Sequence, residues 1–144
     1  MAGWVSVREL VEGEDRWVLP LEGGTVVQCR VDYAFTLVVE ANAASYEVRI
    51  EQPFELCTNG GRRRLTWHED PVALAPALAV LHARVAEALA VKDGRFEIRF
   101  RDGRRLEVPA NADFEAWTLV GPGGLQLVSM PGGELAVWSA EGQG

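Results

Sequence analysis

The chain has 144 residues, a length that predicts one domain over residues 1–144. Its 48% hydrophobic and 24% charged content is ordinary for a globular protein and excludes a disordered class. The net charge of −7 disfavours nucleic acid and anionic membranes as partners, and the longest apolar run falls short of the roughly 20 residues of a membrane span.

Two further features favour a cytoplasmic protein. The segment Met1–Trp4 contains no basic leader, which argues against a secretory signal. The two cysteines, Cys29 and Cys57, lack the paired spacing of zinc ribbons and thioredoxin-like proteins. In a reducing compartment we expect each of them to behave as a small buried hydrophobic residue.

Alternating hydrophobic residues predict a β-meander in the first half of the chain. Trp17–Leu21 is expected to form a first, edge segment, because Pro20 has no N–H to donate to a ladder. Three strands follow, each with an inward row at every second residue. These rows are Val27, Cys29 and Val31; Phe35, Leu37 and Val39; and Tyr46, Val48 and Ile50. A short fourth strand is expected to begin at Phe54.

The pattern changes in the middle of the chain. The glycine- and arginine-rich stretch Asn59–Arg64 is expected to be a loop. Asp70 and Pro71 then form a helix start, because the carboxylate accepts free backbone N–H groups and proline suits the first helical position. The sequence predicts a helix over about residues 71–81, kinked or beginning at Pro76. Its apolar stripe comprises Leu74, Leu78 and Leu81.

The segment 84–91 has two interpretations. Its alanines favour a continued helix, whereas Val85, Leu89 and Val91 alternate as in a strand. We predict a strand, because two hairpin signals, Asp93-Gly94 and Asp102-Gly103, follow it.

The C-terminal part has the regularly spaced turn residues of another antiparallel meander. Three apolar segments are separated by Gly121–Gly124 and Pro131–Gly133, and glycine pairs permit the positive φ angles of tight turns. The predicted fold is therefore α+β and strand-dominated. Its antiparallel meander units are expected to form a sandwich or partly open barrel, with one central inserted helix covering an open edge or end.

An internal duplication is a further prediction. The units 25–56 and 85–117 align strand by strand, and the match places Phe54-Glu55 against Phe114-Glu115. If a pseudo-twofold axis relates the units, the two glutamates approach one another as a carboxylate pair. The alternative is that both glutamates point outward beside buried phenylalanines.

Four segments resemble a known family. They are Trp17–Leu21 (WVLPL), Arg30–Leu37 (RVDYAFTL), Glu51–Phe54 (EQPF), and the ending with Glu115–Trp117 (EAW), Gly121–Gly124 (GPGG) and Pro131–Trp138 (PGGELAVW). Together they are similar to a family of small uncharacterised actinobacterial proteins, classed as a domain of unknown function. The resemblance implies no active-site residue. At Ala41–Ser45 the family tends to have a compact Asp-Gly turn, so a longer and looser hairpin is expected here.

The candidate binding residues are Tyr33, Trp67, His68 and Asp70. The cluster from Trp67 to Asp70 precedes the predicted helix, where backbone N–H groups favour anions, and a histidine beside a carboxylate can act as an acid–base pair. The ordinary interpretation makes Asp70 a helix cap, Trp67 an apolar contact and His68 a solvated side chain. Tyr33 is the type of residue that is enriched at recognition surfaces.

No catalytic residue, metal site or cofactor is predicted. His68 and His82 fall at opposite ends of the predicted helix, which is too far apart for one ion. The chain also has no nucleophile elbow and no phosphate-binding loop.

The leading functional hypothesis is therefore a non-enzymatic protein-binding or regulatory module. An acidic immunity-type inhibitor that masks a basic partner is one concrete version, because the net charge of −7 steers such an encounter. The alternative is a small hydrolase or lyase that uses His68 with a nearby carboxylate. A homo-oligomer assembled through strand edges is a third interpretation.

Overall fold

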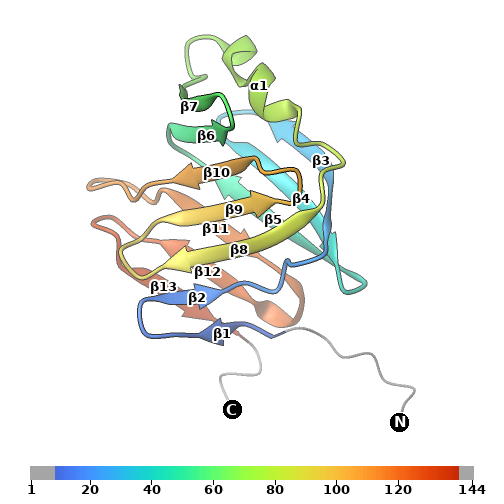
Figure 1. The fold of residues 1–144 in the computed structure, drawn as a ribbon. Coiled ribbons are helices and arrows are strands. Elements are labelled where there is room, and N and C mark those ends of the chain that lie inside the picture. Colours follow the sequence, from blue (N-terminus) through green and yellow to red (C-terminus); the bar gives the residue numbers. More distant parts are fainter. Residues whose placement is uncertain (1–8, 140–144) are drawn as a thin grey trace.

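Two antiparallel β-sheets pack face to face, and they do not close into a barrel (Figure 1). The computed structural model describes residues 9–139, so the segment Met1–Trp4 lies outside the described residues. The predicted strand-dominated α+β fold is confirmed, in its sandwich form and with a single inserted helix.

The described residues form thirteen strands. The first sheet has the order β1-β2-β8-β9-β10-β6-β7 and the second the order β13-β12-β11-β5-β4-β3. The strands of the first sheet are β1 Val11–Glu12, β2 Arg16–Val18, β6 Phe54–Thr58, β7 Gly61–Leu65, β8 Val85–Val91, β9 Phe96–Phe100 and β10 Arg105–Val108. Those of the second are β3 Thr25–Val31, β4 Phe35–Ala41, β5 Ala44–Ile50, β11 Trp117–Val120, β12 Gln126–Ser129 and β13 Leu135–Trp138. The segment 85–91 is thus a strand, as predicted.

The meanders β3-β4-β5 and β8-β9-β10 lie in different sheets, and the strand that follows each meander along the chain pairs in the opposite sheet. The meander β3-β4-β5 lies in the second sheet, but β6, which follows it, pairs with β10 in the first. Reciprocally, β8-β9-β10 lies in the first sheet, and β11 pairs with β5 in the second. The two sheets are therefore joined by crossed strands as well as by their packed faces.

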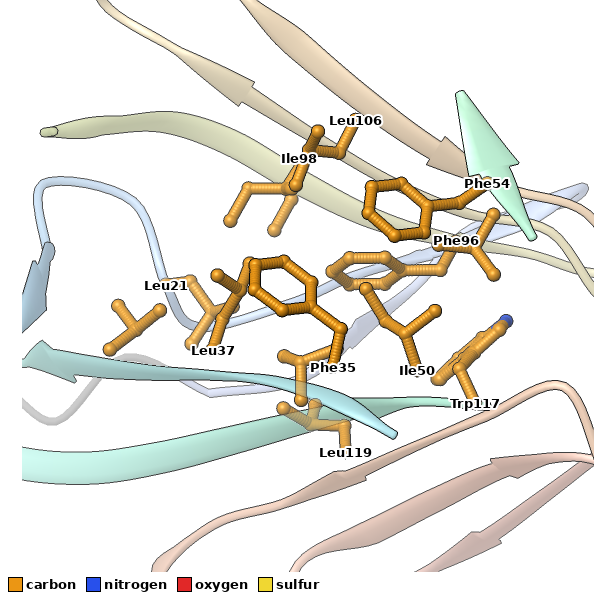
Figure 2. Close-up of a cluster of buried hydrophobic side chains, with 14 of the residues drawn as sticks. Leu21, Phe35, Leu37, Ile50, Phe54, Phe96, Ile98, Leu106, Trp117 and Leu119 are labelled. Atoms are coloured by element: carbon orange, nitrogen blue, oxygen red, sulfur yellow. The ribbon is translucent and has the colours of Figure 1, made fainter. Parts of the chain in front are cut away.

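Aromatic rings from both sheets meet in the core (Figure 2). Phe35 of the second sheet stacks on Phe54 of the first, with ring centroids 5.6 Å apart. Phe96 of the first sheet packs on Trp117 of the second at 5.2 Å. All four side chains are buried, so these ring contacts help to hold the two sheets together.

The two meanders also meet at a corner with reciprocal hydrogen bonds. Thr25 at the start of β3 forms an isolated bridge with Arg84, just before β8. Around this bridge the N–H of Val26 donates to the carbonyl of Ala83 at 3.0 Å, and that of Val85 donates to Gly24 at 2.8 Å. The two hydrogen bonds are equivalent, because Val85 and Ala83 each lie 59 residues after their counterparts Val26 and Gly24.

This corner explains the conformation of His82. The N–H of His82 donates to the carbonyl of Val26 at 2.7 Å, and the N–H of Gly23 donates to Val85 at 2.9 Å. Both donor residues have a left-handed backbone conformation, with φ of 74° at His82 and 82° at Gly23. His82 thus occupies a backbone position that favours glycine, and its place in the fold is that of a corner residue.

A β-bulge in β3 corrects the predicted inward row of that strand. The register shifts between Val26 and Gln28, so Val26, opposite Val39, is buried whereas Val27 is the extra residue and is exposed. Cys29 and Val31 stay on the predicted face, opposite Leu37 and Phe35, although Val31 is exposed at the end of this edge strand. Strand β8 has its own register shift, between Val85 and Glu87.

The registers also correct the predicted match of Phe54 with Phe114. Leu56 lies opposite Leu106 on β10, and Leu119 lies opposite Val48 on β5, so β6 and β11 have equivalent places beside the two meanders. Leu56 and Leu119 are therefore equivalent positions, and counting back two residues from each relates Phe54 to Trp117. Phe114 instead lies before β11 with 69% of its surface exposed. The duplication of units 25–56 and 85–117 itself stays a prediction.

The inserted helix is shorter than residues 71–81. A 3-10 turn, η1 (Pro71–Leu74), leads into one α-helical turn, α1 (Ala75–Leu78). The buried residues recur at every third position, which is the period of a 3-10 helix and explains why Leu78 and Leu81 are exposed. These buried residues are Leu74, Ala77 and Val80. Pro76 in the α-helical turn lacks the N–H that a longer helix needs.

Two predicted loops are tighter than expected. Ala41 pairs with Ala44, so the β4–β5 connection is a two-residue turn with φ of 56° at Asn42 and 63° at Ala43, as in a type I′ turn. The expectation of a looser hairpin there was wrong. The stretch Asn59–Arg64 is also mostly strand, because β7 begins at Gly61 and pairs with β6. A second short 3-10 element, η2, spans Pro122–Gly124.

The β8–β9 turn fastens the first sheet to the second. The carbonyl of Gly94 accepts hydrogen bonds from Trp117 Nε1 at 2.9 Å and from Ser129 Oγ at 2.8 Å. A Cβ at Gly94 would lie 2.5 Å from the Cα of Gly133, so the two turns touch backbone to backbone. Gly94 is therefore required by contact as well as by its positive φ of 102°.

A pair of glycine substitutions tests this contact. Gly94→Ala should lower the free energy of unfolding by at least about 3 kcal/mol, because backbone strain and steric overlap add. Gly103→Ala is the matched control, since φ is 96° there and no atom lies within 4 Å of the added Cβ. It should cost only about 1–2 kcal/mol. Equal losses in urea denaturation would contradict the proposed contact.

Candidate functional site

Trp67 is a core residue. It is 2% exposed, its ring meets Phe54 edge-on at 5.7 Å, and it also stacks on His68 at 4.9 Å. The carboxylate of Asp70 accepts from the N–H of Val72 at 3.1 Å and caps η1. Asp70 is therefore a helix cap and Trp67 an apolar core contact, as in the ordinary interpretation of this cluster. Trp67 presents no surface to a partner.

His68 is exposed beside this core tryptophan. Within residues 9–139, no carboxylate lies at ion-pair distance from its ring. The second histidine, His82, belongs to the β3–β8 corner described above. The part of the chain that the structure describes therefore places no carboxylate at ion-pair distance from His68 for proton transfer.

Tyr33, unlike Trp67, is an exposed member of the predicted binding residues. It lies in the β3–β4 turn with 87% of its surface exposed. The carboxylate of Asp32 shapes this turn by accepting from the N–H of Ala34 at 2.7 Å. The same carboxylate lies 3.8 Å from Arg49, which in turn lies 3.9 Å from Glu51. Tyr33 thus stands beside a row of charged groups at the end of the second sheet.

The β10–β11 loop adds a second exposed aromatic residue at this end. Asn111 Oδ1 accepts from the N–H of Asp113 at 2.8 Å and of Phe114 at 3.0 Å, which fixes the loop. The N–H of Glu51 donates to the carbonyl of Ala116 at 2.9 Å, so the loop runs beside the end of β5. Phe114 is a functional candidate that the sequence alignment assigned to the core.

A buried amide holds the loop in place. Gln52 donates from Nε2 to the carbonyl of Pro109, and its Oε1 accepts from Asn111 at 2.9 Å. The glutamine is almost fully buried, and both ends of its amide are satisfied. The β5–β6 and β10–β11 crossings are therefore tied to each other where they leave the sheets.

We call the resulting surface the acidic rim. It consists of Asp32, Tyr33, Glu51, Phe114 and Glu115. The rim lies at one end of the second sheet. Its residues adjoin Phe35, Ile50 and Trp117 in the chain, and these three residues lie opposite one another across the strands. It combines two exposed aromatic rings with three carboxylates, of which two lie near one arginine, Arg49.

A second cluster lies on the outer face of the first sheet. Ligand atoms of Glu55, Cys57 and Glu107 lie within 4.8 Å of one another. Arg62 already bridges the two carboxylates, at 2.6 Å from Glu55 and 3.2 Å from Glu107, and these bonds raise the pKa of its guanidinium. A metal ion would have to displace this arginine. The carboxylate beside Glu55 is Glu107, whereas the sequence match had suggested Glu115.

The two cysteines, Cys29 and Cys57, are free thiols. Burial raises the pKa of the Cys29 thiol, which keeps it protonated at neutral pH. Cys57 is buried, as predicted, and Cys29 is half-buried.

The fold and the surface define a class of protein: a two-sheet β-sandwich with crossed strands and an acidic, aromatic rim. The chain belongs to a family of unknown function, DUF6188, whose model matches residues 17–139. No curated protein and no solved structure matches the chain. In the described part of the chain, no helix has the length and apolarity to cross a membrane.

Paired alanine substitutions distinguish the core tryptophan from its exposed neighbour. Trp67→Ala should lower the free energy of unfolding by about 3–5 kcal/mol, because it empties a buried site between Phe54 and His68. His68→Ala should change it by less than about 1 kcal/mol. Chemical denaturation followed by circular dichroism measures both. A large loss in the His68 variant would show that this side chain supports the fold.

Proposed function

We propose that the protein is a non-enzymatic binding module of the cytoplasm that recognises a basic partner protein through the acidic rim. The observation that carries this proposal is the 87% exposure of Tyr33 beside Asp32 and Glu51. An immunity-type inhibitor that covers a cationic surface of its target is the concrete form of this function.

The chemistry of the rim supports this assignment. Tyrosine and phenylalanine bury much area at low entropic cost, and interface hot spots are enriched in such aromatic anchors. Carboxylates around the anchors select cationic partners and reject anionic ones. The net charge of −7 adds a long-range attraction that accelerates encounter with a basic protein.

The backbone of the rim also favours binding. Both aromatic residues stand on short segments that are fixed by side-chain hydrogen bonds, Tyr33 by the Asp32 turn and Phe114 by Asn111. A surface that is ordered before binding loses little conformational entropy when a partner docks. The hydrolase or lyase alternative has less support, because His68 lacks a neighbouring carboxylate among the described residues.

Affinity capture from the native host tests the proposal. The tagged protein should retain a basic protein that is released as the salt concentration rises, because screening weakens the attraction. The double variant Tyr33→Ala/Phe114→Ala should weaken binding of that protein at least about 100-fold, in line with the loss of two anchors. Titration of the purified pair by calorimetry measures the affinity.

Val72→Ala is the matched control, because Val72 is a similarly exposed apolar residue outside the rim, on η1. It should leave the affinity unchanged. A partner whose binding is insensitive to the double variant, or equally sensitive to the control, would contradict recognition through the rim.

A further inference from the structure

A small cavity opens on the outer side of the first sheet, near the start of β6. Its volume is about 160 Å³, and it is lined by Phe54, Glu55, Arg64, Arg95, Glu107 and Pro109. Strand pairing brings these residues together, because Glu55 lies opposite both Arg64 on β7 and Glu107 on β10. None of the lining residues belongs to the acidic rim.

The two glutamates of the cavity already have cationic partners. Arg62 lies 2.6 Å from Glu55 and 3.2 Å from Glu107. Arg105 lies 2.6 Å from the second oxygen of Glu107. Arg62 on β7 and Arg105 on β10 therefore compensate the negative charges of the two glutamates.

The two arginines of the cavity have no equivalent compensation. Arg64 forms no ion pair within the described residues. Arg95 has only Asp93, at 4.0 Å, the outer limit of an ion pair. The Nε of Arg95 is in addition buried without an acceptor in the part of the chain that the structure describes. Two guanidinium groups with free donors therefore line one cavity in a protein that is acidic overall.

We propose that this cavity binds the oxyanion group, carboxylate or phosphate, of a small ligand between Arg64 and Arg95. Guanidinium donors form charge-assisted, often bidentate hydrogen bonds with such groups. The volume of about 160 Å³ lies below the roughly 300 Å³ of typical drug-sized sites, so the ligand is small. Pro53 and Pro109 supply an apolar wall for the part of the ligand that carries the anion.

Nuclear magnetic resonance of arginine side chains tests the proposal directly. The Nε–Hε signals of Arg64 and Arg95 should shift saturably when inorganic phosphate or benzoate is added, and should stay in place with chloride at equal ionic strength. Saturation by phosphate alone identifies a phosphoryl ligand, whereas saturation by benzoate alone identifies a carboxylate. Absence of a saturable shift with both anions overturns the proposal.

Three glutamine variants complete the test. Arg64→Gln and Arg95→Gln should each weaken binding of the saturating anion at least about tenfold, because each removes charge-assisted donors. Arg63→Gln is the control: it removes the same charge from the same strand, but Arg63 does not line the cavity. Equal weakening in all three variants would indicate a general charge effect and overturn the site. Because Arg64 is exposed, its variant remains informative if the Arg95 variant is unstable.

Discussion

The exchange of β6 and β11 between the two sheets is the constraint on which the rest of the structure depends. Only a few residues separate β5 from β6, so the chain passes directly from the second sheet to the first. Phe54 consequently faces Phe35, and Trp117 faces Phe96, across the core. A crossing of this kind takes polar backbone and side chains into the interior, where they need partners. Gln52 supplies such a partner, because its amide donates to the carbonyl of Pro109 and accepts from Asn111.

The crossings also determine where the acidic rim forms. The turn that carries Tyr33 and the loop that carries Phe114 both lie where strands of the second sheet end, beside the exit of β5. Loops held by a rigid scaffold are the usual place for recognition residues. In this protein the scaffold consists of the tied crossings, so the exposure of the two aromatic rings is a consequence of the same topology that buries Phe54 and Trp117.

Local patterns in the sequence predicted most elements but not their register. Alternation located β4 and β5 with their inward rows, and the Asp70 cap located the helix start, because both signals depend on neighbouring residues. The bulge after Val26 and the exposure of Phe114 depend on pairing with strands far along the chain. The same holds for Trp67, whose burial follows from contact with Phe54. Of the two aromatic residues of the acidic rim, sequence reasoning therefore named Tyr33 as a candidate, whose binding role stays a prediction, and placed Phe114 in the core.

The distribution of charge separates the two proposed sites. On the first sheet, several arginines are neutralised by cross-strand carboxylates, as in the pairs Arg62–Glu55 and Arg99–Glu87. The cavity arginines are outside these pairs, and the rim has an excess of carboxylates. An anion that suits Arg64 and Arg95 would be repelled by the rim, and a basic protein that suits the rim would be repelled by the cavity. The two surfaces therefore select ligands of opposite charge, and neither proposal requires the other.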